Sequence, residues 1–309
     1  MLRLRFTAED LLRVRLAARP APLLELGMAV ATLRRDDAVF RGWARRTRLP
    51  RAAHPLYELI PPTATGPLFV DPVSEGLEDG LDMVLSTRQA DARAELARTC
   101  RPTRLTRGLA GRDPGAWGTL ENAIRAAYGA IIDRDGTAMR ASFDADLAWR
   151  RMLLSERGAG AALAGIHPGG RWVGTTLEFD VPHDGEHAAD GRGVTLLPSA
   201  FWAGRPMVGT HRDGSMLLVY PALTPVPLVD AAPGDALSAL LGRTRAAILE
   251  LLVEQRTTTE IARKLGISAA SASAHAKTLR DAGLVASRRA GKAVVHVVTP
   301  LGARLLARR

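Results

Sequence analysis

Cysteine is nearly absent from this sequence, with Cys100 alone among 309 residues. A single thiol cannot form an internal disulfide, and it cannot build a zinc site from several thiolates. Long apolar runs are also lacking, because none approaches the roughly 20 residues that a membrane-spanning helix needs. The first ten residues reach Glu9 and Asp10 without the apolar stretch of a signal peptide. We therefore expect a reduced, cytoplasmic protein without membrane segments.

Lysine is rare as well, with 39 arginines but only Lys264, Lys277 and Lys292. Such a bias is typical of an arginine-rich, high-GC coding background, so the net charge of +10 does not by itself identify a partner. Its distribution is more informative. Residues 1–234 carry 29 arginines against 27 acidic residues, whereas residues 235–309 carry 13 basic residues against 5 acidic ones. A small basic terminal domain is typical of nucleic-acid binding; the alternative is a solvated charged tail.

Familiar catalytic and metal-binding motifs are missing. The sequence has no Gly-x-Ser-x-Gly elbow, no phosphate-binding loop that ends in Gly-Lys-Ser/Thr, and no Cys-x-Cys pair. Residues 183–187 include two histidines, but Pro182 and nearby glycines favour a solvated loop. Residues 158–165 resemble half of a dinucleotide fingerprint, yet they follow an expected helix rather than a strand. Asp144 and Asp146 are interpreted as helix-start residues. We therefore predict no catalytic residue, no metal site and no cofactor.

The first three quarters of the chain read as a mostly helical domain. Helical patterns are expected at residues 8–17, 22–34, 36–48, 74–85, 88–98, 114–131 and 137–157. A short strand is expected at residues 2–6, and β-rich segments at 172–179, 193–197, 206–210 and 216–220 are expected to form a small antiparallel sheet. Four prolines between residues 221 and 233 predict a stiff linker. We therefore expect an N-terminal regulatory and dimerisation domain at 1–230 and a second domain at 236–309.

The C-terminal domain shows the pattern of a helix-turn-helix. Apolar residues at helical spacing predict a first helix at residues 237–252. A capping box at residues 257–260 opens a short helix, and Gly266 ends it in left-handed geometry. Ser268 then caps a further helix that runs to about residue 282. Two helices joined by a three-residue turn that contains glycine are typical of this motif.

The second of these helices is the expected recognition helix. Unrolled at about 100° per residue, it directs Ala272, Ala276 and Leu279 toward the core. The residues expected to contact DNA are Ser268, Ala270, Ser271, Ser273, Ala274, His275, Lys277 and Thr278. Small side chains allow a close approach, hydroxyls can donate to phosphates or base edges, and alanine can touch a thymine methyl. His275 has two interpretations, a packed or phosphate-orienting side chain and a base contact.

A basic hairpin is expected directly after this helix. Residues 283–299 read as two strands around a turn that Gly291 permits. Near its tip lie the remaining expected DNA-binding residues, Arg288, Arg289 and Lys292. Such a wing suits contacts to the DNA backbone or the minor groove. Further phosphate contacts are expected from Arg256, Arg263 and Lys264.

These motifs resemble the winged helix of ArsR/SmtB-type bacterial transcription regulators. The resemblance rests on residues 242–252, 259–268, 273–275 and 279–285. It implies a winged helix-turn-helix that binds DNA as a homodimer and represses transcription. Residues 1–11 and 191–199 resemble an uncharacterised domain that precedes such winged helices in high-GC bacteria. That second resemblance implies no particular ligand.

We therefore expect an α+β protein, with a mostly helical N-terminal domain and a small antiparallel sheet followed by a C-terminal winged helix-turn-helix. Its expected function is sequence-specific binding of double-stranded DNA as a transcriptional regulator and not as an enzyme. A small-molecule effector at the N-terminal domain could reorient the two DNA-binding domains of a homodimer. Tryptophans of that domain pack in its core or line an effector pocket. Two alternatives stay open: an enzyme that modifies a small molecule and carries an accessory winged helix, and a winged helix that binds proteins.

Overall fold

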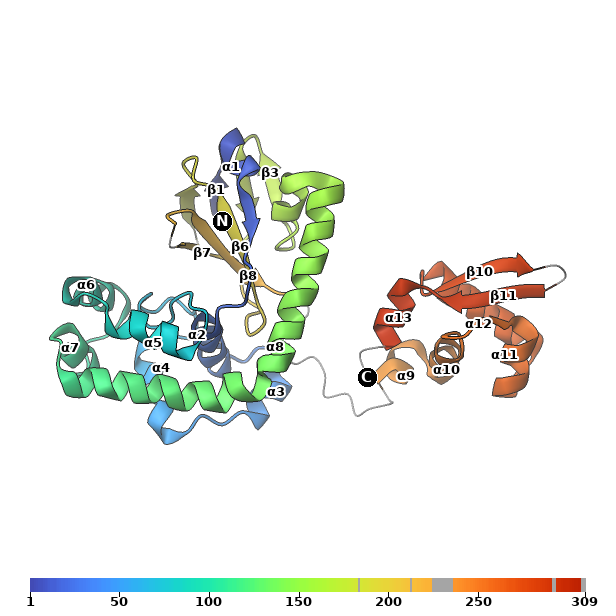
Figure 1. The fold of residues 1–309 in the computed structure, drawn as a ribbon, viewed down its shortest axis with the longest axis horizontal. Coiled ribbons are helices and arrows are strands. Elements are labelled where there is room, and N and C mark those ends of the chain that lie inside the picture. The colour runs from blue at the N-terminus through green and yellow to red at the C-terminus, as the bar shows by residue number, and fades with distance from the viewer. Residues whose placement is uncertain (183, 212, 224–235, 291–292, 307–309) are drawn as a thin grey trace. The chain divides into compact units, whose positions relative to one another are not determined.

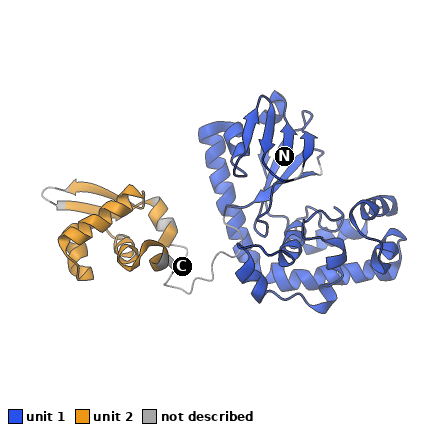
Figure 2. Cartoon of the chain, turned by 180° about the vertical axis from the view of Figure 1, so that it is seen from behind, with its two compact units in different colours: residues 1–229 blue, residues 230–309 orange. Residues whose placement is uncertain are grey.

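In the computed structural model of the chain, the described residues are 1–182, 184–211, 213–223, 236–290 and 293–306. They belong to two compact units, Met1–Val229 and Asp230–Arg309 (Figure 2), and each unit is described by itself. Beyond its first three residues, the linker expected at 221–234 lies outside the described residues. None of the helices in the described ranges is long and apolar enough to cross a membrane.

The first part of unit 1 is mainly helical (Figure 1). Its elements are β1 (Leu2–Arg5), α1 (Ala8–Leu12), β2 (Val14–Leu16), α2 (Pro22–Leu33), α3 (Arg41–Arg46), the 3-10 helix η1 (Arg51–Ala53), α4 (Leu56–Leu59), α5 (Leu77–Leu85), α6 (Gln89–Thr99) and α7 (Arg104–Ala110). Thr7 caps α1 as expected, but the helix expected at 8–17 is too long. The chain becomes a strand after Leu12 because Val14 and Leu16 pair with a later strand.

A single long helix, α8 (Pro114–Ala164), replaces the two helices expected in this region. It begins at an Asp113 cap with proline in its first turn, and it extends from the helical part to the sheets (Figure 1). The helical backbone continues through residue 135, although α8 changes direction sharply about halfway along its length (Figure 1). There, Asp135 accepts a hydrogen bond from the Trp43 indole at 2.8 Å, while Ile131 and Ile132 are buried, so tertiary contacts support the helix. The helical backbone angles are interrupted farther along, at Gly158, where φ is 76°.

Two four-stranded sheets complete unit 1. The later strands are β3 (Arg171–Val173), β4 (Thr176–Phe179), β5 (Gly185–Ala188), β6 (Val194–Ser199), β7 (Met207–Thr210) and β8 (Met216–Pro221). The strand orders are β3-β4-β1-β5 and β2-β6-β8-β7. The expectation of one small antiparallel sheet is therefore wrong. Each sheet includes parallel pairs, β1 with β5 in the first sheet and β6 with both β2 and β8 in the second.

The segment expected to be a solvated loop at residues 183–187 is also partly a strand. Gly185 to Ala188 form β5, which pairs in parallel with β1, whereas residue 183 itself is not described. Strands from the N-terminus thus complete sheets whose other strands come much later in the chain. Local sequence patterns cannot show such pairing, because the partners are separated by the whole helical part.

The second sheet is covered on both faces. Leu196 and Leu218 belong to a core that both sheets share with the end of α8. Leu197 and Leu217, one position away on the same strands, belong to the larger core of the helical part. Side chains alternate between the faces of a strand, so β6 and β8 must be apolar on both sides. This explains their near-continuous apolar sequences.

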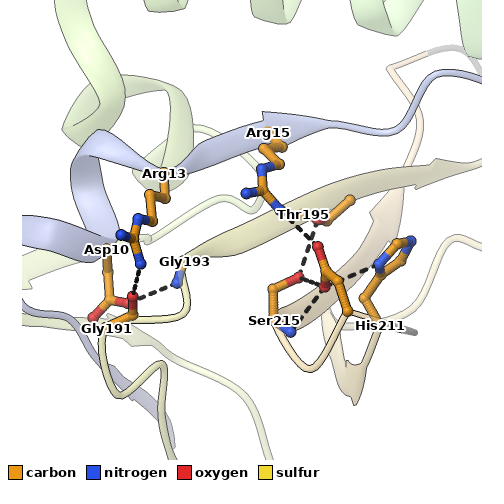
Figure 3. A network of polar contacts seen from close by, with 9 residues as sticks. Asp10, Arg13, Arg15, Gly191, Gly193, Thr195, His211 and Ser215 are labelled. Atoms are coloured by element: carbon orange, nitrogen blue, oxygen red, sulfur yellow. Dashed lines mark hydrogen bonds and ion pairs between the residues drawn. The ribbon is translucent and has the colours of Figure 1, made fainter.

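Polar contacts join β2 and its flanks to the later loops (Figure 3). The buried Asp10 carboxylate accepts a hydrogen bond from the Gly193 amide at 2.8 Å, and Arg13 donates to the Gly191 carbonyl at 2.7 Å. Burial acts to raise the pKa of Asp10, but hydrogen bonds from Thr7 and Gly193 outweigh it and lower the pKa. A Cβ at Gly193, whose φ is 79°, would lie 2.5 Å from the Arg13 carbonyl oxygen, so this approach requires glycine.

Glu25 joins the helical part to the end of β6. Its carboxylate accepts hydrogen bonds from the Ser199 hydroxyl at 2.9 Å and from the amides of Ala200 and Phe201 at 2.8 and 3.2 Å. Only 1% of the residue is exposed. Burial raises the pKa of Glu25 to about 7, although the three donors act in the opposite direction.

Unit 2 consists of short helices and a three-stranded antiparallel sheet. Its elements are α9 (Ala236–Leu241), α10 (Arg243–Leu251), β9 (Arg256–Thr257), α11 (Thr258–Leu265), α12 (Ala269–Asp281), β10 (Val285–Ala290), β11 (Ala293–Val298) and α13 (Pro300–Leu306). The strand order is β10-β11-β9. The single helix expected at 237–252 is two helices, because Gly242 interrupts it with a φ of 82°. Leu240, expected on the apolar face, is 71% exposed.

Candidate nucleic-acid interface

Helices α11 and α12 form the helix-turn-helix that the sequence predicts. Thr257 and Glu260 make a reciprocal capping box at the start of α11, and Gly266 ends that helix in the left-handed conformation with φ 64°. Ser268 then caps α12 by accepting a hydrogen bond from the Ser271 amide at 3.0 Å. These local signals place α12 directly after a three-residue turn.

Helix α12 has one buried face and one exposed face. Ala272, Ala276 and Leu279 are at most 1% exposed and pack in the unit 2 core, as the helical spacing predicts. The exposed residues of the predicted DNA-binding set on this helix are Ala270, Ser273, Ala274, Lys277 and Thr278. Ser271 and His275 are partly buried at the edges of this face. We use the name α12 face for the four residues Ala270, Ser273, Ala274 and Lys277.

Some hydroxyls of the predicted DNA-binding residues already donate hydrogen bonds within unit 2. The Ser268 hydroxyl donates to the Ser271 hydroxyl at 3.0 Å, and Thr278 donates to the Ala274 carbonyl at 3.2 Å. Within the described part of unit 2, the hydroxyl of Ser273 makes no intramolecular hydrogen bond. Ser273 is therefore the hydroxyl best placed to form a new hydrogen bond from the α12 face.

The wing is formed by β10 and β11, which pair in antiparallel register from Val285 with Val298 to Ala290 with Ala293. Arg288 and Arg289 are exposed on β10. The Arg288 guanidinium donates to the Gln255 side-chain oxygen at 3.1 Å, a contact that sequence patterns do not indicate. The predicted contact residue Lys292 lies outside the described residues.

Several basic side chains form no ion pair within the part of unit 2 that the structure describes. Arg263, Lys264, Lys277 and Arg289 are exposed, and no carboxylate lies within ion-pair distance of them in the described ranges. Arg256 differs from them, because it pairs with Glu254 and donates to the Leu251 carbonyl at 3.2 Å. Its predicted role as a phosphate contact would require these contacts to change. Positive charge without internal neutralisation is suited to a polyanion.

His296 is a buried polar residue of unit 2 that local sequence patterns did not single out. It lies on the central strand β11, is 3% exposed, and contacts the Thr258 hydroxyl with Nε2 at 3.0 Å and the Ser287 hydroxyl with Nδ1 at 2.7 Å. Burial lowers its pKa, and the nearby Arg280 lowers it further. The ring thus joins the wing to the start of α11. A lone polar residue in the apolar sequence of β11 was the available signal.

His211 and Ser215 (Figure 3) both contact Asp213 in unit 1, and the three are the residue types of a catalytic triad. However, the Ser215 hydroxyl and the His211 Nδ1 both contact the same oxygen of Asp213, at 2.6 and 3.1 Å. A nucleophilic serine requires its hydroxyl on the histidine. The contacts, which lower the pKa of Asp213, instead close the turn between β7 and β8, and Arg15 adds an ion pair at 2.6 Å.

Two further expectations concern individual residues. Asp146, interpreted as a helix-start residue, lies in the middle of α8 and is fully buried. Trp149, expected in the core, is 42% exposed, whereas Trp117 and Trp202 are buried. Among the described residues, no group of three His, Cys, Asp or Glu side chains is arranged to hold a metal ion.

Comparisons with known proteins identify the domain type of unit 2. Residues 240–288 match the family model of a helix-turn-helix domain. A crystal structure of a possible transcriptional regulatory protein (fragment 1–100) from Mycobacterium bovis matches at 35% identity, over 23% of this chain and 77% of that fragment, with a TM-score of 0.21. No curated protein sequence matches the chain. The chain therefore contains a C-terminal helix-turn-helix domain, within the α11, α12 and wing architecture described above.

Proposed function

We propose that this protein is a transcriptional regulator that binds double-stranded DNA sequence-specifically through unit 2. The observation that carries the proposal is the α12 face. It lies opposite the buried side of the second helix of a helix-turn-helix, and its residues are small apart from Lys277. A helix with small exposed side chains can approach base edges closely in the major groove.

In this proposal the two parts of the interface have different roles. The α12 face and its edge residues Ser271 and His275 read bases or contact phosphates in the major groove. Ser268 and Thr278, at the start and on the flank of α12, lie near the backbone. The wing, with Arg288, Arg289 and Lys292, contacts the backbone or the minor groove, and Arg263 and Lys264 add charge to the same interaction.

The finer proposal is an ArsR-like repressor that binds as a homodimer. A twofold dimer would place two copies of α12 in successive major grooves. The last helix, α13, is short, so unit 1 would supply part of the dimer contacts. We further propose that unit 1 is the regulatory domain, in which a bound small molecule alters DNA affinity. A coupling of about 1–3 kcal/mol would change affinity about 5- to 150-fold.

The test is selection of genomic fragments by the full-length protein, followed by a salt titration on the preferred fragment. We expect one site to exceed bulk DNA by about 10³-fold or more, with affinity falling steeply as salt rises. Lys277→Ala should reduce this preference. Arg288→Ala should weaken binding to all sequences and reduce the salt slope by about 1.

Arg93→Ala is the matched control. Arg93 is an exposed arginine on α6 in unit 1, so this substitution removes the same charge outside the proposed interface. It should leave the affinity and the sequence preference nearly unchanged. Equal binding of all fragments together with weak affinity at low salt would overturn the proposal.

A further inference from the structure

Unit 1 contains a cavity of about 610 Å³, a volume typical of small-molecule sites. Its lining combines the helical part and the sheets: Leu24 and Met28 come from α2, and Leu217 and Val219 from β8. These side chains are apolar and almost fully buried from solvent. The space between the two parts of unit 1 is therefore suited to an apolar molecule.

An exposed apolar side chain also borders this cavity. Leu68 belongs to the lining and is 62% exposed. Leucine gains free energy when it is removed from water, at roughly 25 cal/mol per Å² of apolar surface. The cavity therefore opens onto an apolar side chain that faces solvent. A bound apolar ligand would cover this side chain and remove it from water.

The lining contains one acidic group in an unusual setting. The Asp71 carboxyl lies against α2 at Gly27, where an added Cβ would be 2.1 Å from Asp71 Oδ2. Within the described ranges, no other residue forms a hydrogen bond or ion pair with this carboxyl. Burial raises the pKa of Asp71 well above its ordinary value, and the charge of Glu95 raises it further. A positively charged ligand group next to this carboxyl would favour its ionised form and offset the raised pKa.

Basic residues in the lining are less suited to define the ligand. Arg98 is exposed and Arg205 is partly exposed. An anion would gain little from a guanidinium that water already solvates. Asp71 is itself partly exposed, but its carboxyl packs against the α2 backbone at Gly27, so an ion pair there would be less screened by water than one at the exposed Arg98.

We propose that this cavity binds an apolar small molecule that carries a basic nitrogen, with the protonated nitrogen beside Asp71 and the apolar part between α2 and β8. The site itself does not depend on DNA. Its role as an effector site rests on the proposed function. A change at the cavity can be transmitted along β8, because this strand leads directly to the last described residues of unit 1. The Asp146 carboxylate holds this end of the strand by accepting hydrogen bonds from the Tyr220 hydroxyl at 2.6 Å and the Leu223 amide at 3.1 Å.

The experiment is a fluorescence titration of the full-length protein, without DNA, with three related probes. Dansylcadaverine carries a primary amine, N-pentyl dansylamide is its neutral analogue, and dansyl-6-aminohexanoate is its anionic analogue. We expect the amine to bind about tenfold more tightly than the neutral probe or better, equivalent to about 1.4 kcal/mol. Asp71→Asn should abolish this preference and retain binding of the neutral probe. Leu68→Ser, at an exposed position, should weaken the amine and the neutral probe equally.

The possible results distinguish the proposed ligand site from its proposed effect on DNA binding. Equal binding of the amine and the neutral probe, tightest binding of the anionic probe, or a preference that persists in Asp71→Asn would overturn the proposed site. Thermal unfolding of each variant establishes that it is folded. If the amine binds as expected, its effect on the affinity for the preferred DNA fragment is measured next. An unchanged DNA affinity would overturn the effector role, and failure to prefer any DNA fragment would overturn the proposed function while the ligand site remains.

Discussion

Glu25 shows how far one residue can depart from what its sequence neighbourhood indicates. In the sequence it is a charged residue in the first turn of an apolar helix, where the helix dipole stabilises a carboxylate. In the structure it is buried against three donors at the end of β6. The residue thus connects the helical and sheet parts of unit 1, and no local pattern in the sequence marks this role.

The raised pKa of Glu25 predicts a pH dependence of stability. The pKa is about 7 in the folded protein against 4.5 in the unfolded chain, so the folded form binds more protons in this interval. The stabilisation is complete below about pH 4.5 and is lost as the pH rises through about 7, with an upper bound of about 3 kcal/mol. Thermal unfolding of unit 1 between these pH values should show a falling midpoint.

Two variants check this assignment. Glu25→Gln cannot ionise, so its unfolding midpoint should lose this decline, although its absolute stability should also fall because an amide cannot accept from all three donors. Glu58→Gln, which changes an exposed glutamate on α4, should retain the decline. An unchanged decline in Glu25→Gln would contradict the assignment.

The residues of α12 illustrate the opposite case, because their positions were predictable. Ala272, Ala276 and Leu279 are buried, as helical periodicity alone predicts. What periodicity could not show is which polar groups are already satisfied. Thr278 donates to the Ala274 carbonyl, and Arg288 donates to Gln255. These contacts depend on rotamers and on neighbouring turns, which the spacing of residues does not specify.

At the scale of elements, α8 is longer than either helix expected in its place. Both the helix propensity of its residues and their packing against the rest of unit 1 favour helical backbone between the two expected helices. Gly136 lies within the continuous helix with ordinary backbone geometry, whereas Gly158 has a φ of 76° and interrupts the helical backbone angles. The segment around residue 135 remains helical because Trp43 bonds to Asp135. A sequence pattern shows both glycines as equal weak points, but of the two only Gly158 departs from helical backbone angles.

This difference predicts opposite effects of the same substitution. Gly136→Ala should stabilise unit 1 by about 0.5–1 kcal/mol, because alanine is the better helix former and a Cβ there meets nothing within 4 Å. Gly158→Ala should destabilise it by about 1 kcal/mol or more, because a Cβ disfavours positive φ even though the surrounding space is open. Chemical denaturation of the two variants tests the contrast. Stabilisation by both substitutions would show that the interruption at residue 158 does not require glycine.

The sheets show why the predicted strand segments did not assemble as expected. Four of the expected β-rich segments in the second half of unit 1 do contain strands, β3 with β4, β6, β7 and β8. The choice of partners was wrong because β1 and β2 insert beside strands from the far end of the unit. Strand propensity is local, whereas pairing depends on which edges the folded helices leave free.

Over the whole molecule, the charge difference between the two units agrees with separate roles. Residues 235–309 carry the excess of basic residues, and the remaining residues are near neutral. Unit 1 holds a cavity and unit 2 holds the helix-turn-helix. This division supports the proposal that DNA binding and its regulation occupy different units.

The proposed homodimer predicts the arrangement of its DNA site. Two copies of α12 related by twofold symmetry should protect two half-sites about 10–10.5 base pairs apart, or a multiple of that distance. Hydroxyl-radical footprinting of the preferred fragment measures this spacing. Sedimentation of the protein–DNA complex should give two chains per site. A single protected half-site bound by one chain would contradict the dimer.

The sequence alone determined the helix-turn-helix, because capping boxes, a left-handed glycine and helical periodicity are local signals that need no tertiary contact to be recognised. Only the tertiary structure decided the parallel pairing of β1 and β2, the continuity of α8, and the positions of Glu25 and Asp71. Each of these depends on groups far apart in the chain that meet only after the cores have packed. The proposed DNA interface could therefore be predicted from local patterns, whereas the proposed ligand site could not.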